Sequence, residues 1–454
     1  MEEISVYPPF VEEVDTTISA FVGYSAKAIG KDGEDLRLVP TKINSIREYE
    51  CFFGSLYESD LELSLSKGNN GKLVIIGKKE MVPSYHLYDS VSVFFENGGV
   101  CCYIVSVGLY QNPPQFRLRS GPDHPAFGLL DGLNRLESVS DLSLLVIPEA
   151  VNLMQDEYAT LVQATLKQCA SLGNRLAIFD LYQGDCGDPD LSLNRGMYGS
   201  VGLNSGCVYY PFVRIVRNFA VNIEESNVSI VLDGVRSTLC DLKNSDKSAY
   251  KFIRKALTRW QLRIPCSGAI AGAYVATDLR KGVWKSPANL NLAGVEGPVV
   301  AIDNKQQELL NVDPDQGKSI NSIREFPGRG TLVWGARTLA GNDCEWRYVP
   351  VRRFFIMVQE SLIKSTQWVI YEPNDSATWM RVRAMIESYL TLKWQNGALA
   401  GIFPHTAFYV KCGAGITMTR KDILEGRTIV EVGLAMIRPS DYIVLRFSQQ
   451  LIRF

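Results

Sequence analysis

Residues 328–450 decide the fold class, because five segments with strong local signals follow one another there. They read GRGTLVWGARTL from Gly328, WRYVPVRRFF from Trp346, TQWVIYEPND from Thr366, TMTRKDILEGRTIVEVG from Thr417 and RPSDYIVLRFSQQ from Arg438. The first two segments predict strands at 331–334 and 348–351, and a helix is expected over 353–366. This part of the chain therefore mixes helices and strands, as an α+β domain does.

The next helix is predicted by its end signals and by its apolar period. Asp375 or Ser376 can cap its start, and Asn396-Gly397 stops it. Between these ends, apolar side chains recur at helical spacing, namely Trp379, Val382, Ile386, Tyr389 and Leu390. This spacing gives the helix one apolar face for packing.

Two strands are expected at the end of the chain, joined by a turn over 438–441. In each strand alternate residues are apolar, which places them on one face. That face carries Val430, Val432, Leu434 and Met436 in the first strand, and Ile443, Leu445 and Phe447 in the second. The pattern indicates an antiparallel hairpin with one buried side.

The region 126–213 has the clearest α/β pattern of the chain. A nearly continuous apolar strand at 142–147 is followed by an amphipathic helix at 156–171 and a second apolar strand at 175–181. A strand, a helix and a strand within about 40 residues predict a right-handed parallel crossover. A third strand is expected at 206–213.

The sequence thus predicts a multidomain chain with α/β and α+β parts. We expect an N-terminal β-arm (1–23), an outer α/β domain (24–300) with an inserted β-lobe (about 215–262), an inner α+β domain (301–428) and a C-terminal β-arm (429–454). Further expected elements are a helix at 88–95, a strand at 100–107, a helix at 248–260, a small-residue helix at 265–274 and a polar linker at 303–318.

Both ends of the chain are extended and apolar. After Tyr7-Pro8-Pro9, apolar residues alternate through Val14, Ile18 and Val22, and the C-terminal strands repeat the pattern. An isolated strand or hairpin is marginal in water, so such ends must join a sheet of the same subunit or of its neighbours. If neighbours receive them in a head-to-tail contact that does not close, a helical filament results.

Composition narrows the possible functions. The chain has 454 residues, 46% of them hydrophobic and 21% charged, and a net charge of -2. At least two domains are expected at this length, and nothing favours nucleic acid as a partner. No apolar run approaches a membrane span, and the start is unlike a signal peptide. We therefore expect no direct membrane insertion. The ten cysteines lack metal or redox spacing, so we expect reduced, mostly buried thiols.

Candidate catalytic and metal-binding groups are sparse. The three histidines, His86, His124 and His405, are far apart in sequence. Asp185, Asp188 and Asp190 could hold calcium, but glycines and a proline among them favour a solvated loop. An α/β enzyme would place its site at the strand ends near Pro148 and Asp180, where no catalytic group is evident. We therefore expect no catalytic, cofactor or metal site and no enzyme activity.

The motifs from 265 to 449 resemble the sheath proteins of contractile phage tails and of related bacterial injection particles. The resemblance is fainter at YDSVSVFFENGG (88–99) and NRLAIFD (174–180). Since one chain carries the whole pattern, it is more similar to extracellular contractile injection systems than to a two-protein type VI sheath. Ser365 stands where the resemblance implies a glycine before Thr366-Gln-Trp368.

The resemblance implies a structural subunit that polymerises helically, in stacked hexameric rings, around an inner tube. By this resemblance, arms at 10–21 and 429–447 complete sheets on neighbouring subunits, 301–428 forms the inner domain, and the middle of the chain lies outside. Contraction would drive the tube through a target envelope, with a baseplate, a cap and sheath paralogues as further partners and no nucleotide or cofactor. Assembly is expected in the bacterial cytoplasm, in a particle that is released or anchored to a membrane.

Two assignments within this picture have alternatives. The short polar helix after Thr419 is expected to contact the inner tube through Arg420, Lys421 and Asp422; an ordinary solvated helix face is the alternative. The chain could also be a minor or non-contracting sheath-like subunit at the baseplate or cap of the same particle.

Overall fold

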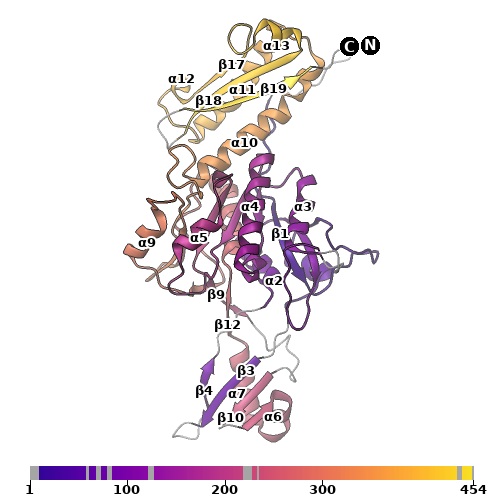
Figure 1. Ribbon diagram of the computed structural model, residues 1–454, viewed down its shortest axis with the longest axis vertical. Helices are drawn as coiled ribbons and strands as arrows, with labels where there is room; N and C mark the ends of the chain where they lie inside the picture. The colour runs from indigo at the N-terminus through magenta and orange to yellow at the C-terminus, as the bar shows by residue number, and fades with distance from the viewer. Residues whose placement is uncertain are drawn as a thin grey trace.

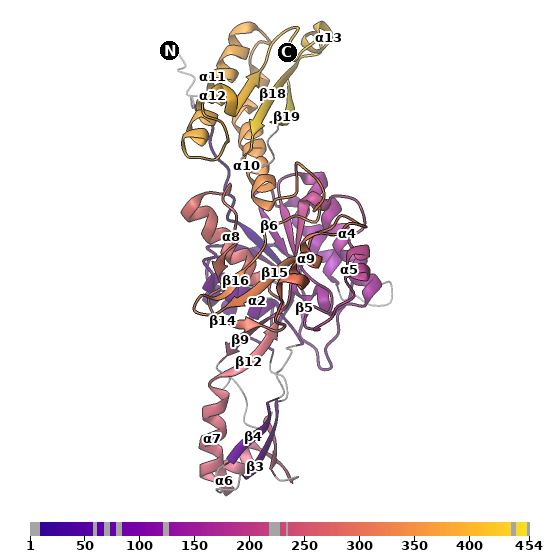
Figure 2. The same cartoon turned by 90° about the vertical axis from the view of Figure 1, so that its left-hand side faces the viewer.

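The computed structural model shows an elongated molecule with a central α/β unit, a C-terminal domain at one end and a small lobe at the other (Figures 1 and 2). It describes residues 10–57, 61–67, 73–78, 84–120, 127–217, 228–232, 235–436 and 442–451. None of the helices within these ranges is both long and apolar enough to span a bilayer.

A nine-stranded sheet forms the centre of the molecule. Its order is β13 (Leu290–Asn291), β16 (Gly330–Val333), β15 (Asn321–Phe326), β8 (Gly206–Tyr210), β7 (Leu176–Asp180), β6 (Leu144–Val146), β1 (Ser19–Ser25), β5 (Cys102–Leu109) and β2 (Thr41–Ile43). The strands from β8 to β5 run parallel. The expected strands at 142–147, 175–181 and 206–213 and their parallel crossover are confirmed.

Helices cover both faces of this sheet (Figure 2). α2 (Leu87–Glu96) and α8 (Ser267–Lys281) pack on one face, and α3 (Leu129–Arg135) and α4 (Gln155–Leu172) on the other. β1 is buried on both sides, since Phe21 belongs to the first core and Val22 to the second. The expected helices at 88–95, 156–171 and 265–274 are confirmed.

Glycines let α8 approach α2 as closely as the small-residue pattern predicted. A Cβ on Gly268 would lie 2.4 Å from the carbonyl oxygen of Ser90, and a Cβ on Gly272 would lie 2.4 Å from that of Phe94. Neither site has room for a side chain, so the two helices touch backbone to backbone.

The lobe is larger than the insertion expected from the sequence. Its four-stranded sheet, in the order β11-β10-β3-β4, pairs β10 (Val228–Leu232) with β3 (Leu61–Lys67) in parallel. The lobe also contains β4 (Leu73–Lys78), β11 (Val235–Thr238), α6 (Leu239–Ser245) and α7 (Lys247–Leu257). The prediction missed β3 and β4. β3 lies more than 150 residues before its partner β10, and β4 pairs with β3 in an antiparallel hairpin. A three-stranded sheet of β12 (Trp260–Ile264), β9 (Val213–Arg217) and β14 (Val295–Pro298) connects the lobe to the centre.

The C-terminal domain packs two long helices against a three-stranded antiparallel sheet. The helices are α10 (Val349–Ser365) and α11 (Ser376–Gln395), and the sheet order is β17 (Phe408–Lys411), β18 (Arg427–Ala435), β19 (Tyr442–Gln450). The predicted hairpin faces are confirmed by the register, which pairs Val430 with Phe447, Val432 with Leu445 and Leu434 with Ile443, all buried. The turn expected at 438–441 lies outside the described residues.

The boundary expected at residue 301 is wrong. The strand predicted at 331–334 is β16, which pairs with β15 in the central sheet and not in the last domain. Residues 348–351, predicted as a strand from their β-branched side chains, instead enter α10, whose first turn accommodates Pro350 because its missing N–H is not needed there. The C-terminal domain therefore begins with α10.

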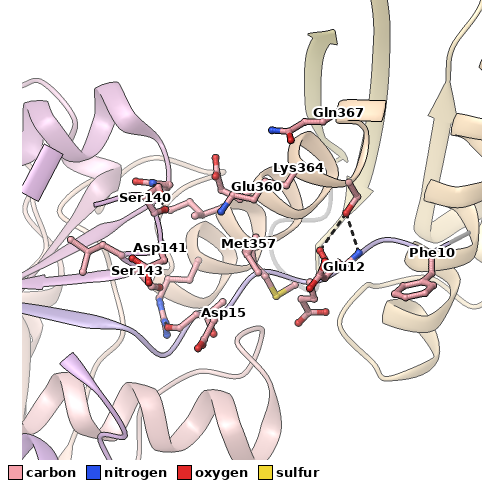
Figure 3. Close-up of a pocket in the computed structure, with 18 of the residues that line it drawn as sticks. Phe10, Glu12, Asp15, Ser140, Asp141, Ser143, Met357, Glu360, Lys364 and Gln367 are labelled. Carbon is pink, nitrogen blue, oxygen red and sulfur yellow. Dashed lines mark hydrogen bonds between the residues drawn. The ribbon is translucent and has the colours of Figure 1, made fainter. Parts of the chain in front are cut away.

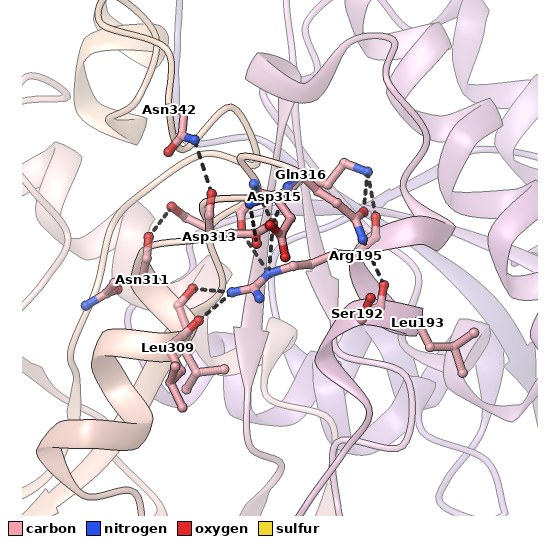
Figure 4. Close-up of polar contacts among 12 residues, drawn as sticks. Ser192, Leu193, Arg195, Leu309, Asn311, Asp313, Asp315, Gln316 and Asn342 are labelled. Atoms are coloured by element: carbon pink, nitrogen blue, oxygen red, sulfur yellow. Dashed lines mark hydrogen bonds and ion pairs between the residues drawn. The ribbon is translucent and has the colours of Figure 1, made fainter.

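The segment 303–318, expected to be a polar linker, contains α9 (Asn304–Asn311) and is fixed to the central unit (Figure 4). Arg195 of α5 (Leu191–Met197) donates from Nη2 to the carbonyl oxygen of Leu309 (2.5 Å) and from Nε to that of Lys318 (3.0 Å). Lys318 Nζ returns a hydrogen bond to the carbonyl oxygen of Arg195 (2.6 Å). Buried backbone carbonyl groups thus bind both cations. The polar composition of residues 303–318 reflects their hydrogen bonding to the central unit.

Candidate assembly site at the C-terminal domain

The N-terminal segment does not extend away from the subunit as the predicted arm required. Ile18 and Val22 are 4% and 0% exposed, and β1 is hydrogen-bonded to β5 on one side and β6 on the other. A strand with both edges paired cannot add to a neighbour's sheet. The expected arm is therefore corrected here: these residues belong to the subunit's own central sheet.

Residues 10–18 instead bridge the central unit and the C-terminal domain. Val11 is buried in the core of the C-terminal domain, and Val14 packs against the same core. The backbone N–H groups of Glu12 and Val14 donate to the hydroxyls of Ser365 and Ser361, both at 3.0 Å. We call this bridging segment, residues 10–18, the strap.

The strap fits α10 because the two backbones have matching repeats. Two residues of extended chain span about 6.6 Å, and four residues of helix rise about 6 Å. Ser361 and Ser365 are four residues apart, so they meet alternate residues of the strap. The sequence signal was present, since Arg353, Met357, Ser361 and Ser365 repeat every four residues, but Ser361 and Ser365 were not predicted as functional.

A buried ion pair anchors the other end of the strap. Arg353 of α10 donates to both carboxylate oxygens of Asp278 of α8, at 2.9 and 2.6 Å, and to the carbonyl oxygen of Thr16 at 2.9 Å. The Thr16 hydroxyl donates to Asp278 at 2.8 Å. Burial raises the pKa of Asp278, an effect that the Arg353 charge offsets only in part. This cluster joins the C-terminal domain, the central unit and the strap.

α11 adds a further contact to the strap. Lys393 forms an ion pair with Glu13, and the Tyr389 hydroxyl lies 3.5 Å from the same carboxylate. The Lys393 ammonium also lies 5.5 Å from the ring centre of Trp284. Both long helices of the C-terminal domain therefore hold the strap.

A pocket of about 780 Å³ lies beside the strap, between α10 and the loop before β6 (Figure 3). Its floor is apolar, with Met357 of α10 and Leu142 among its lining residues. Its charged lining residues are mainly acidic and include Glu12, Asp15, Asp141 and Glu360, with Arg353 and Lys364 as the cations. It separates the two large units on the side that the strap leaves open.

The C-terminal sheet leaves β19 at its edge. In β19 alternate side chains are buried and exposed, and Val444 is 50% exposed on the outer face. Among the described residues, only β18 pairs with β19. A nine-residue edge strand offers unpaired backbone groups to another extended chain. The six arm residues predicted between Val430 and Phe447 are thus core residues of this domain, and the free edge beside them is the available contact.

α13 (Arg420–Leu424) brings together the three residues predicted to contact a tube. Arg420 and Lys421 are exposed. The Asp422 carboxylate has partners within the subunit. It accepts hydrogen bonds from the Thr419 backbone and hydroxyl, which lower the pKa of this carboxyl. It also pairs with Arg427 at 2.8 Å. Asp422 therefore caps its own helix, and two cations remain exposed.

The acidic residues near the sheet ends also cap helices. Asp180 accepts hydrogen bonds from the Ser267 backbone and hydroxyl at the start of α8, and burial raises its pKa to about 6. Glu149 accepts from the backbone N–H of His86 (3.2 Å) and of Leu87 (2.9 Å) at the start of α2, and burial raises its pKa to about 8. Burial lowers the pKa of His86 to about 4. These groups are closed to solvent and hold helix ends.

The remaining predicted candidates lie apart from one another. Asp190 of the Asp185, Asp188 and Asp190 loop caps α5 by accepting from the backbone of Leu193 at 2.9 Å. His405 stacks on Phe403 with ring centres 5.5 Å apart. His124 lies outside the described residues. Within the described ranges, no three or more potential ligands group as a metal site would require.

The C-terminal domain coincides with a known protein family. Residues 342–450 match the family described as the phage tail sheath C-terminal domain. This chain carries a tail sheath C-terminal domain. The tail sheath protein of Vibrio phage KVP40 is 25% identical over 179 residues, 39% of this chain and 26% of that protein. The tail sheath protein of Enterobacteria phage T4 is 27% identical over 150 residues, which are 33% of this chain and 21% of that protein. The chain thus spans about a quarter of these sheath proteins' length.

Solved sheath structures match the whole chain. The sheath of the extracellular contractile injection system PVC, in its contracted state, is 27% identical with a TM-score of 0.61, and the match covers 99% of this chain and 96% of that one. The contracted helical sheath of the anti-feeding prophage is 27% identical with a TM-score of 0.63, covering 99% and 98%. A chain of the anti-feeding prophage baseplate is 29% identical with a TM-score of 0.60, covering 97% and 96%. The central unit and the lobe therefore belong to the sheath fold together with the C-terminal domain.

Proposed function

We propose that this chain is a structural subunit of a contractile sheath, which polymerises helically around an inner tube and shortens to drive that tube through a target envelope. The observation that carries the proposal is the end-to-end match to sheath chains in the contracted state, at 27% identity. The buried helix caps support a structural role, because Asp180 and Glu149 are used inside the fold.

Assembly would use surfaces that the subunit leaves open. The unpaired edge of β19 can accept an extended segment of a second copy, and we propose that the residues before Phe10 supply it. A strand added in this head-to-tail way gives a heterologous contact, and such contacts extend into helices when they do not close. Stacked hexameric rings, an inner tube, a baseplate, a cap and sheath paralogues complete the proposed particle.

The exposed face of α13 is the proposed contact with the tube. Lys421 is 80% exposed and its 3.8 Å pair with Glu425 lies at the surface. Exposed charge pairs contribute little energy each, which suits a contact that must break when the sheath contracts. Charge reversal at Arg420 and Lys421 should abolish co-assembly with the tube but leave tubes of the sheath chain alone intact. Unchanged co-assembly would assign α13 to ordinary solvent exposure.

Electron microscopy of the purified chain tests the main proposal. Wide hollow striated tubes from the chain alone, and longer sheathed rods when its genomic neighbours are co-expressed, are expected. A monomer or a small closed ring in both preparations would refute it. A variant lacking residues 1–9 should form no tubes, because it lacks the proposed donor segment.

A second candidate is a minor sheath-like subunit at the baseplate. It is favoured by the 29% identity to a chain of the anti-feeding prophage baseplate. Such a subunit would be found at one end of the particle and would not form long tubes alone. Gold labelling of a tagged chain in the assembled particle separates the two, since a main sheath component is labelled along the whole length. In either case we propose assembly in the bacterial cytoplasm, in a particle that is later released or anchored to a membrane.

A further inference from the structure

The lobe presents a basic helix at the end of the molecule farthest from the C-terminal domain (Figures 1 and 2). α7 buries Ala249, Ile253 and Leu257 against the lobe and turns its other side to solvent. On that side Lys247, Lys251 and Lys255 are exposed at a four-residue spacing. Four residues of helix rise about 6 Å and turn slightly more than once round the axis, so the three lysines form a slanted row along one side of the helix. We call this row the lysine stripe.

Within the described residues, no acidic side chain pairs with the lysine stripe. Residues 236–259 contain seven basic and two acidic residues, a net charge of +5, in a chain whose total is -2. Both acidic residues are used as helix caps: Asp241 accepts from Thr238, and Asp246 from the backbone of Ser248 and Ala249. Where the structure describes the chain, the ammonium groups of the three lysines form no ion pair or hydrogen bond.

The lysine stripe also destabilises its own helix. Like charges four residues apart destabilise a helix. A glutamate at one of these positions would instead attract the neighbouring lysine and stabilise the helix. Each exposed position could carry any polar residue without loss of packing. The local cost indicates that the charge serves a contact outside the subunit.

We propose that the lysine stripe docks the subunit on the surface of a membrane rich in anionic phospholipid. Lysine binds phosphate as a point charge and does not need the fixed fork geometry of arginine. Phe252, next to Lys251, is 38% exposed and can bury its ring in the headgroup layer beside the charges. Phe252 is a single exposed ring, and Tyr250 contacts Lys243 and Arg254, so α7 does not offer the successive stacking rings that single-stranded nucleic acid uses.

The docking is peripheral and depends on copy number. The apolar face of α7 is buried in the lobe, so the helix can adsorb by its charges and Phe252 but cannot insert. One subunit carries only a few of these charges, each of modest effect at an anionic surface. A polymer that repeats the lobe along its length multiplies the contact without any new interaction. The single-subunit affinity does not rest on the proposed sheath function, whereas this multiplication does.

Vesicle co-sedimentation of the full chain tests the proposal. Wild-type protein is expected to sediment with phosphatidylglycerol vesicles at low salt, to stay in solution with phosphatidylcholine vesicles, and to be released at about 1 M salt, where the Debye length is about 3 Å. The Lys247→Glu/Lys251→Glu/Lys255→Glu variant should bind at least about ten-fold more weakly.

A matched variant, Lys167→Glu/Lys281→Glu/Lys305→Glu, changes the net charge equally at exposed sites outside the lobe and should bind as wild type. Circular dichroism and tube formation should be unchanged in both variants, which separates this test from that of the sheath function. Equal binding by the two variants, equal binding to both lipids, or no binding by wild type would overturn the proposal. Tighter binding to double-stranded DNA than to the anionic vesicles would overturn it in favour of nucleic acid.

Discussion

The guanidinium of Arg353 meets the carboxylate of Asp278 in a two-point contact that is almost closed to solvent. The two hydrogen bonds measure 2.9 and 2.6 Å, and each side chain is 4% exposed. The Arg353 charge also lies 5.4 Å from the ring centre of Tyr274. Since Arg353 belongs to the C-terminal domain and Asp278 to the central unit, this pair fixes the orientation of one on the other.

Removing one partner of this pair should destabilise the protein strongly. Arg353→Met leaves the Asp278 carboxylate buried without its counter-charge, and we expect a loss of about 3–5 kcal/mol in the free energy of unfolding. The double variant Arg353→Met/Asp278→Leu should recover most of that loss, because no buried charge remains. Urea unfolding measures both.

The exposed pair between Arg381 and Glu372 is the control for that experiment. It measures 2.7 Å, but Arg381 is 53% exposed. Arg381→Met should therefore cost at most about 1 kcal/mol. Equal losses at Arg353 and Arg381 would show that the buried pair has no special role.

The strap should loosen when its serine partners are removed. Ser361→Ala leaves the Val14 N–H without an acceptor at a partly buried position, and we expect a loss of about 1–3 kcal/mol. Ser365→Gly removes the more exposed bond to Glu12 and should cost about 1 kcal/mol or less. A Glu-specific protease should cut after Glu12 and Glu13 faster in both variants.

Thr391→Ala provides a matched comparison for the strap. Its hydroxyl bonds only the carbonyl oxygen of Glu387 in its own helix. Cleavage at Glu12 and Glu13 should keep the wild-type rate in this variant. If Ser361→Ala is cut no faster than Thr391→Ala, the serines do not hold the strap.

Stability should fall as the pH rises through the titration of Glu149. The folded pKa of about 8 lies above the ordinary value of 4.5, so the folded chain binds this proton more tightly than the unfolded chain. The contribution is complete below pH 4.5 and is lost as the pH approaches and passes 8. Glu149→Gln, which keeps the acceptor for His86 and Leu87, should flatten this part of the stability profile.

Asp375 gives the opposite slope. The Thr378 backbone lowers the pKa of its carboxyl, so its contribution is present above its ordinary value of 3.8 and is lost as the pH falls through its folded pKa. Asp375→Asn should change the profile only in acid. An unchanged slope between pH 4.5 and 8 in Glu149→Gln would contradict the assignment of that slope to Glu149.

The central α/β crossover could be predicted because its signals are local. β6 lies in a continuous apolar run, and α4 has a single helical period. Tertiary contacts do not change the secondary structure that these local patterns predict. The hairpin of β18 and β19 was equally clear, since its alternation gives the correct buried face in both strands. The alternation could not show whether a strand pairs within the subunit or with a neighbouring subunit.

The N-terminal error has the same physical origin. The segment from Val14 to Val22 is extended and apolar, but no local feature distinguishes a strand paired with β5 and β6 from one donated to a neighbour. Its first half is not a strand at all, because side-chain hydroxyls of α10 replace the ladder hydrogen bonds. The lobe was incomplete for a related reason, since β3 pairs with β10 across more than 150 residues.

The close approach of α2 and α8 supplies the last prediction. A Cβ at Gly272 would lie 2.4 Å from the Phe94 carbonyl oxygen, a backbone atom that cannot rotate away. Gly272→Ala should therefore force the helices apart and cost about 1–3 kcal/mol in urea unfolding. Gly196, in α5, has no atom within 4 Å of the equivalent Cβ, so Gly196→Ala should stabilise the protein by up to about 1 kcal/mol through helix propensity. Opposite signs for one chemical change isolate the packing effect, and stabilisation by both would show that α8 can move away from α2 without loss.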